Sequence, residues 1–377
     1  MKPRIFSSSE WRFEGLGLGS LPDAISCTVT EDLCGRDWRG GEYALEMEYP
    51  ITGHNYDLLV EERIICVKPS ENATEWQPFR IYAISRPIGG VVTVKADHIS
   101  RQLKKVTIQE FSMFGALSDT MTYITNTCVP NAHFVFQKIG NDYISTYGCK
   151  TPKNVFDLLC GQESILDQYS STYPECYTWD KWNVKLGTRG SDRGVTITYG
   201  INMIGIEKAS DMTNTITGYM PYWEDDQKVV RRLSSLGFYD DVVLSPNYTD
   251  YVYKMIEPLD VGSIYNDHKE DPAATLAQLI QDYAYEQLAK VSILPATIDV
   301  DFVSLNATDQ YKSLMESRMI RLGDTVKVRY DALGINEKQR VIKTVFNVLA
   351  NRYESIEIGT KQIDLAGVIA KIAKRSK

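Results

Sequence analysis

Few residues in this sequence have the type and spacing that chemistry requires, and Cys160 is the first to consider. It ends an apolar helical run, and a cysteine nucleophile needs a histidine base that the fold brings to it. The chain has four histidines, of which His98, His133 and His268 could take that role in a hydrolase. A single cysteine in an apolar helix is more often a small core residue. We therefore expect Cys160 to be packed, with cysteine–histidine hydrolysis as the alternative.

A pair of aspartates in "TIDVDF" is the second candidate. Asp299 and Asp301 alternate with apolar residues, so they share one face of a strand, about 7 Å apart. Paired carboxylates at such a distance can cleave glycosides or hold a metal ion. The same alternation is typical of a strand with one wet face, and we favour that simpler interpretation.

Three other motifs lack the spacing of the sites they resemble. Glycines 15, 17 and 19 do not match the G-x-G-x-x-G pattern of a phosphate-binding turn. Ser164 in "CGQES" is not in a G-x-S-x-G nucleophile elbow. The acidic run Glu224–Asp226 lacks the ligand spacing of a calcium loop, which indicates a solvated loop. The sequence therefore predicts no catalytic, cofactor-binding or metal-ligating residue, and no cofactor.

His98 is the last candidate. It ends the segment "FRIYAISRPIGGVVTVKADH", which predicts a hairpin over residues 79–98. Alternation gives the hairpin one apolar face. On it Phe79, Ile81, Ala83 and Ser85 of the first strand lie opposite His98, Ala96, Val94 and Val92 of the second. The outer face pairs opposite charges and a cation with an aromatic ring: Arg80 with Asp97, and Lys95 with Tyr82. His98 should therefore be a packed wall residue opposite Phe79.

The elements that would position these residues are mostly strands. Residues 1–105 alternate like a β-barrel or sandwich, whereas 106–189 read as a small α/β subdomain. Strand patterns return over 190–360 with a helical insertion near 271–291, and 361–377 has helical spacing. The sequence predicts a mainly β (α+β) fold: a first β-barrel domain, the α/β subdomain, a related second β-barrel domain and a C-terminal helix.

Two helices carry recognisable end signals. One has Thr151 as N-cap, Pro152 at the first helical position and Gly161 after its end. The other would be capped by Asp271 with Pro272 following it. Its apolar stripe is broad and comprises Leu276, Leu279, Ile280, Tyr283 and Leu288.

Composition narrows the function classes. The net charge of −8 argues against a dedicated nucleic-acid binder, which needs a basic face. The seven cysteines include no C-x-x-C, so a zinc ribbon and a dithiol redox motif are unsupported and reduced thiols are expected. No apolar run is long enough to span a membrane and no secretory leader is visible, so we expect synthesis in a cytoplasm without membrane insertion.

Tryptophans leave one binding function open. A carbohydrate-binding receptor module needs exposed aromatic rings gathered in a groove, and Trp179, Trp182 and Trp223 are possible members. The first two belong to residues 177–187, which read as a single strand. Packing in the core is the interpretation we favour for each.

An ordered series of segments resembles one family. The segments are "LGLGSLPDAISCTVTEDLCG", "PFRIYAISRPIGGVVTVKADHIS", "GVTITYGINMIGIEKASDMTNTITGYMPYW" and "LGDTVKVRYDALGINEKQRVIKTVFNVLANRYESIEIG". Together they are similar to the N-terminal region of siphophage minor structural proteins, the tail-associated baseplate-hub proteins also labelled prophage tail endopeptidases. The likeness covers nearly all of residues 12–370.

This resemblance implies a hub of two related β-barrels with α/β subdomains, assembled as a ring-shaped homotrimer in the virion tail tip. It implies docking to the distal tail protein, contact with the tail tube or tape-measure protein, and attachment of a spike or a lysin. In many such proteins a peptidoglycan hydrolase domain follows the hub, and this sequence stops at Lys377, where it would begin. Acidic residues are expected to line any central channel, so that DNA passes without sticking. The alternatives are a cell-wall endopeptidase or other hydrolase, and a host-carbohydrate receptor module.

Overall fold

The computed structural model divides the chain into two compact units, which are described separately. Unit 1 comprises Met1–Lys208 and Ile298–Thr360, and unit 2 is built on Ala209–Thr297. The structure describes these residues: 2–35, 41–71, 73–85, 89–130, 133–161, 163–168, 175–198, 203–210, 215–246, 248–291, 296–302, 320–330 and 335–359. The segment 361–377, predicted to be a helix, lies outside them, and the predicted domain bounds stay predictions.

One sheet of 13 described strands forms the frame of unit 1. Its early strands are β1 (Arg4–Phe6), β2 (Gly19–Ser20), β3 (Ser26–Asp32), β5 (Tyr43–Pro50), β6 (Ile64–Val67), β7 (Gln77–Ile84) and β8 (Val91–His98). Its late strands are β16 (Asp192–Thr198), β17 (Met203–Ser210), β22 (Ala296–Phe302), β23 (Thr325–Tyr330), β24 (Ile335–Asn347) and β25 (Arg352–Gly359). The order is β17-β22-β25-β24-β3-β5-β8-β7-β6-β1-β2, and β23 joins β24 to β16.

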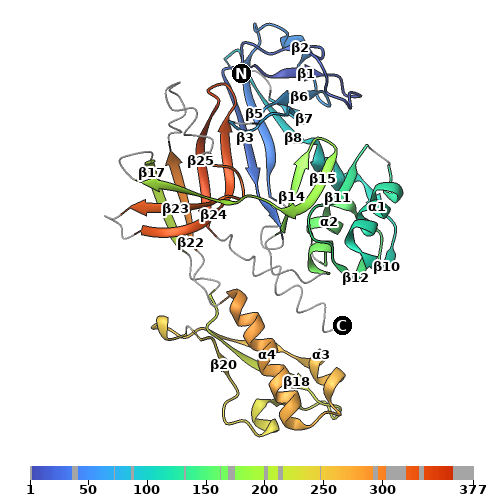
Figure 1. Ribbon diagram of the computed structural model, residues 1–377, viewed down its shortest axis with the longest axis vertical. Helices are drawn as coiled ribbons and strands as arrows, with labels where there is room; N and C mark the ends of the chain where they lie inside the picture. The colour runs from blue at the N-terminus through green and yellow to red at the C-terminus, as the bar shows by residue number, and fades with distance from the viewer. Residues whose placement is uncertain are drawn as a thin grey trace. The chain divides into compact units, whose positions relative to one another are not determined.

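The pairing of β24 with β3 joins the late strands to the early ones. It is antiparallel and runs from Lys343 opposite Asp32 to Asn347 opposite Thr28. In Figure 1 the strands β22 and β23 lie across the direction of β3 and β5, so the sheet curls into a half-barrel. The mainly β class expected from the sequence is confirmed.

Alternation along the strands decides which side chains enter the core. On β5 the side chains of Tyr43, Leu45, Met47 and Tyr49 are buried, and the glutamates between them are exposed. This is the face assignment that the period of two predicts. A continuous apolar cluster extends from this sheet into the α/β subdomain.

The β7–β8 hairpin confirms its predicted register at one end and corrects it at the other. Phe79 lies opposite His98 as expected, but a bulge at Tyr82 shifts the pairing by one residue. Lys95 therefore lies opposite Ala83, and Val94 lies opposite Ile84. A bulge inserts one residue on a single strand and reverses the faces beyond it. The predicted partners of Tyr82 and Ala83 were wrong for this reason, whereas Tyr82 lies on the exposed face as predicted.

The α/β subdomain lies within unit 1. Its elements are β4 (Cys34–Gly35), η2 (Ile99–Lys105), β9 (Thr107–Ile108), β10 (Phe111–Ala116), α1 (Leu117–Thr127), β11 (Val135–Lys138), β12 (Ile144–Cys149), β13 (Lys153–Asn154), α2 (Val155–Cys160), η3 (Ile165–Asp167), β14 (Glu175–Asp180) and β15 (Asn183–Thr188). Its largest sheet has the order β11-β15-β14-β4, so the early strand β4 forms one edge of it.

Two local predictions in this subdomain need correction. The helix α2 begins after Asn154, whose side chain accepts a hydrogen bond from the Asp157 amide, and not after Thr151. The strand β13 takes Lys153 and Asn154 into pairing with β9, which delays the helix. Gly161 follows its last residue as predicted. Residues 177–187 form part of a hairpin of β14 and β15, not one strand.

Unit 2 is a small sheet covered by a long helix. Its elements are β18 (Gly218–Glu224), β19 (Val230–Arg232), η4 (Leu233–Leu236), β20 (Val243–Leu244), η5 (Tyr248–Asp250), β21 (Ile256–Asp260), α3 (Gly262–His268) and α4 (Ala273–Val291). The helix α4 begins directly after Pro272, and its Leu276, Ile280 and Leu288 are buried as the predicted stripe requires. No helix among the described residues is long and apolar enough to cross a membrane.

Candidate functional site

The structure places Cys160 in the core, at the end of α2. Its side chain is buried, and its sulfur lies 3.0 Å from the sulfur of Cys34, which is also buried. Its surroundings are therefore those of a packed thiol, as expected, and its sulfur faces a second thiol on β4.

His98 is a wall residue with both ring nitrogens bonded. Nδ1 lies 2.9 Å from the Ser100 hydroxyl and accepts a hydrogen bond from the Ser100 amide, and Nε2 lies 3.2 Å from Gln77 Oε1. The ring stacks on Tyr43 with centroids 4.2 Å apart. Burial, and then the charge of Arg101, hold the pKa of the imidazole well below its usual value. A neutral, fully bonded imidazole has no free nitrogen with which to act as a base.

The other histidines have their own neighbours. His133 is exposed and stacks against Trp11, with centroids 5.0 Å apart. His268 belongs to unit 2, where its Nδ1 lies 2.9 Å from the Asp271 carboxylate. The backbone N–H of His54 donates to Asp23. The structure thus places these histidines in separate surroundings, and the cysteine–histidine pair considered from the sequence gains no support.

Of the acidic candidates, the structure describes the side chain of Asp225 but not those of Asp299 and Asp301. Asp299 and Asp301 lie on β22, but their side chains fall outside the described residues, so their role stays a prediction. Asp225 accepts hydrogen bonds from the Gln227 and Val229 amides, which closes a turn. Ordinary loop chemistry therefore accounts for Asp225 in the run Glu224–Asp226.

Ser164 and the early glycines also have structural roles. Ser164 is buried and forms a capping box with Asp167 at the start of η3. Gly17 has φ +64°, and a side chain there would meet the carbonyl oxygen of Ile5 at 2.5 Å. Glycine at this position is therefore required by a tight turn against β1. Among the described residues, no group of three or more His, Cys, Asp or Glu side chains is arranged to hold a metal ion.

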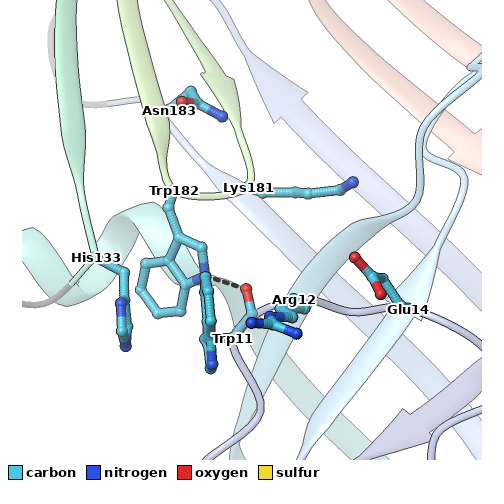
Figure 2. A pocket seen from close by; sticks show the side chains of 7 residues that line it. All are labelled: Trp11, Arg12, Glu14, His133, Lys181, Trp182 and Asn183. Atoms are coloured by element: carbon cyan, nitrogen blue, oxygen red, sulfur yellow. Dashed lines mark hydrogen bonds between the residues drawn. The ribbon is translucent and has the colours of Figure 1, made fainter.

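The tryptophans considered for carbohydrate binding have different surroundings, each within its own unit. Trp179 and Trp223 are buried, in unit 1 and unit 2 respectively. Trp182 is half-buried and lines a shallow hollow of about 420 Å³ together with Trp11 (Figure 2). Core packing is therefore confirmed for Trp179 and Trp223.

The aromatic rings in the hollow around Trp11 contact other side chains of the protein. His133 stacks on one ring with an interplanar angle of 11°, and the Arg12 guanidinium lies 4.7 Å from the ring centroid. The indole N–H of Trp182 donates to the Trp11 carbonyl oxygen at 2.7 Å, as Figure 2 shows. A sugar stacks on an open aromatic face, so this cluster serves better to fasten the N-terminal segment to the β14–β15 hairpin than to bind saccharide.

A second hollow, of about 450 Å³, follows the outer face of the curled sheet, and we call it the acidic groove. Its lining comes from neighbouring strands and comprises Ser26, Thr28, Thr30, Glu42, Ala44, Leu45, Glu46, Glu48, Tyr82 and Lys95. Cross-strand register places Thr28 opposite Glu46, and Glu46 opposite Lys95. Glutamates and hydroxyls dominate this surface. Alternation along β5 accounts for the outward positions of Glu46 and Glu48, but the pattern of one strand does not show that neighbouring strands form a groove.

Comparison with known proteins identifies the fold. Residues 191–369 match the family described as Prophage endopeptidase tail. The prophage tail protein gp18 of Listeria monocytogenes EGD-e is 14% identical over 99% of both chains, with a TM-score of 0.58. The tail protein of Neisseria meningitidis MC58 is 10% identical over 96% of both chains, also with a TM-score of 0.58.

A third structure agrees with these two. The 43 kDa tail protein of prophage MuSo2 from Shewanella oneidensis is 10% identical over 96% of this chain and 98% of that one, with a TM-score of 0.55. None of the curated proteins matches the sequence. The resemblance to tail-associated phage proteins drawn from the sequence is confirmed, and at these identities the solved structures establish the fold alone.

Proposed function

We propose that this chain, which shares the fold of prophage tail proteins, is a structural subunit of a phage or prophage tail tip. As a baseplate hub it forms a homotrimeric ring, docks to the distal tail protein and contacts the tail tube or tape-measure protein. A spike or lysin attaches to it. The observation that carries this proposal is the likeness to prophage tail proteins over 96% or more of both chains.

The acidic groove gives the ring a surface for its channel. DNA is held chiefly by cations that neutralise its phosphates. A face with Glu42, Glu46 and Glu48 offers one lysine, Lys95, and that lysine lies 3.5 Å from Glu46. Such a wall repels the duplex, which suits a channel through which DNA passes without binding.

Molecular mass in solution tests ring formation. A permanent ring should bury on the order of 2,000 Å² or more at each interface. We expect light scattering to give about three times 42.7 kDa across a wide range of protein concentrations, with rings visible by negative-stain microscopy. A mass of one chain at all concentrations contradicts the hub proposal.

Charge reversal tests the position of the groove in the ring. The double variant Glu46→Lys/Glu48→Lys should still assemble, and the ring should now retain duplex DNA at low salt. A matched double variant, Glu61→Lys/Glu62→Lys, makes the same change at exposed residues outside the groove. Equal DNA retention by the two variants removes the groove from the channel wall.

A cell-wall endopeptidase is the second candidate, and the description of the matching family favours it. Its best residues are Cys160, and Asp299 with Asp301. A zymogram on host cell wall distinguishes the two functions. Clearing by the wild-type chain that is lost in Cys160→Ala or in Asp299→Asn supports the enzyme, and no clearing supports the structural role.

A further inference from the structure

Two buried thiols from distant parts of unit 1 meet at one point. Cys34 lies on β4, Cys160 ends α2, and their sulfur atoms are 3.0 Å apart although 126 residues separate them in the chain. Both side chains are buried. This separation is shorter than an ordinary contact between two sulfur atoms, and only a small further approach is needed for a bond.

The strand register selects Cys160 as the partner of Cys34. A third buried thiol, Cys176, lies on the neighbouring strand β14, opposite Gly35, and Tyr177 lies opposite Cys34. Because successive side chains on a strand alternate between faces, Cys34 and Cys176 point to opposite sides of the sheet. Cys34 shares its face with Tyr177 and reaches Cys160 on α2.

We propose that Cys34 and Cys160 form a disulfide bond when the protein meets oxidising conditions. With a low-molecular-weight disulfide such as oxidised glutathione, one cysteine thiolate attacks a glutathione sulfur and releases one reduced glutathione. The second cysteine then attacks the mixed disulfide and releases another. Two protein thiols become one disulfide while one glutathione disulfide becomes two thiols, so atoms and electrons balance.

The bond would fasten the segment that continues β3 of the curled sheet to α2 of the α/β subdomain. The strand β4 follows β3 of the main sheet after a single residue, whereas α2 packs against η2 and η3 of the subdomain. Closing so long a loop restricts the unfolded chain and stabilises the folded one. Because both thiols are buried, oxidation of the folded protein must proceed through local opening and should be slow. This inference does not depend on the tail-tip proposal.

The test is exhaustive oxidation of the purified full-length chain. One sample is held with oxidised glutathione and one with dithiothreitol, and both are then alkylated in denaturant and digested without reduction. We expect the free thiols to fall from seven to five, with one linked peptide pair that joins Cys34 to Cys160. The oxidised form should have an unfolding midpoint higher by at least about 5 °C.

Two variants make the outcome decisive. Cys160→Ser should abolish both the linked peptide and the difference in midpoint. Cys66→Ser removes another buried thiol, on β6, and should leave both unchanged. Seven free thiols after prolonged oxidation, a stable glutathione adduct on Cys34, or a link from Cys34 to Cys176 overturns the proposal.

Discussion

The two compact units bury different kinds of side chain. Unit 1 holds all the charged residues that are buried among the described residues, including Glu31, Glu175 and Asp324. The buried polar residues described in unit 2 are uncharged: Thr215, Thr217 and Ser245. The difference indicates that unit 1 uses charge to specify which segments meet, whereas unit 2 relies on apolar packing of a helix against a sheet.

Buried and half-buried charged side chains in unit 1 join segments far apart in the chain. Arg189 donates from Nη2 to Glu31 Oε1 at 2.7 Å, which links the end of β15 to β3. The Arg340 guanidinium donates to the carbonyl oxygens of Arg189 and Gly323. A buried charge without a partner is costly, so an alternative pairing of these strands is disfavoured.

Charged pairs in unit 2 lie nearer the surface. Asp225 and Arg231 stabilise a turn, and Lys269 contacts Asp226 at 2.8 Å with the Asp226 side chain 66% exposed. The core of this unit is instead an apolar set that includes Trp223 and Ile280. Exposed pairs such as Lys269 and Asp226 contribute little stability, so unit 2 should be insensitive to the loss of either of these two charges.

The largest expected effect is at the buried pair Lys138–Glu175. Nζ of Lys138 lies 2.9 Å from Glu175 Oε1, and the two side chains are 1% and 5% exposed. Lys138→Ala removes the cation that faces this buried carboxylate, so we expect a loss of about 3–5 kcal/mol in the free energy of unfolding of unit 1. Amide hydrogen exchange at β11 and β14 measures this for unit 1 alone.

A double variant controls for lost volume at this pair. Lys138→Met/Glu175→Leu removes both charges and keeps apolar bulk, so most of the stability should return. A double variant as unstable as Lys138→Ala would show that packing, not charge, determines this site.

The core of unit 2 provides the next largest effect. Ile280 on α4 is fully buried, and Ile280→Ala creates a cavity that should cost about 3 kcal/mol. Faster amide exchange is expected in β18 and α4, with no change in the main sheet of unit 1. Gln278→Ala, an exposed change on the same helix, should alter stability by less than about 0.5 kcal/mol. An effect that spreads to β5 and β8 would show that the units unfold together.

Sequence pattern predicted the parts of the fold that depend on near neighbours. The buried face of β5 and the Phe79–His98 pairing follow from a period of two, and the α4 stripe follows from helical spacing. The start of α2 was misplaced because Thr151 and Asn154 are both good N-caps. The pairing of β13 with β9, more than 40 residues away in the chain, determines that the helix begins after Asn154.

The candidate sites were harder to predict because they also depend on contacts between residues far apart in the sequence. The bulge at Tyr82 adds one residue to a strand, and the strand's own alternation does not reveal it. The contact between Cys34 and Cys160 spans 126 residues, and the acidic groove draws its lining from four strands or the turns beside them. Local sequence patterns carry no information on contacts between residues so far apart in the chain.

Acid should lower the stability of unit 1 through protonation of His98, a group that unit 2 does not contain. The pKa of its buried imidazole is far below the value of about 6.5 expected in the unfolded chain, so folding favours the neutral form. This contribution is fully present above about pH 6.5 and is lost as the pH falls toward the folded-state pKa. Unit 1 should therefore lose about 1.4 kcal/mol per pH unit from this group below pH 6.5.

A pH series of urea unfolding, with exchange at β7 and β8 as the readout, measures this slope. His98→Gln should remove the contribution, whatever its effect on stability at pH 8. Arg101→Met should keep most of it, because burial is the larger cause of the pKa shift and the Arg101 charge the smaller. An unchanged slope in His98→Gln assigns the acid sensitivity to another group.

The smallest effect is expected where a lysine and a glutamate face each other in water. Lys95 and Glu46 lie opposite each other on paired strands, and Lys95 Nζ is 3.5 Å from Glu46 Oε2. The two side chains are 50% and 60% exposed. Lys95→Ala should change the stability of unit 1 by less than about 1 kcal/mol, because solvent screens the pair. The change matches Lys138→Ala in kind, since each removes a strand lysine from a strand glutamate, so the difference between the two isolates burial. If both variants cost the same, burial does not determine how much such an ion pair contributes to the stability of unit 1.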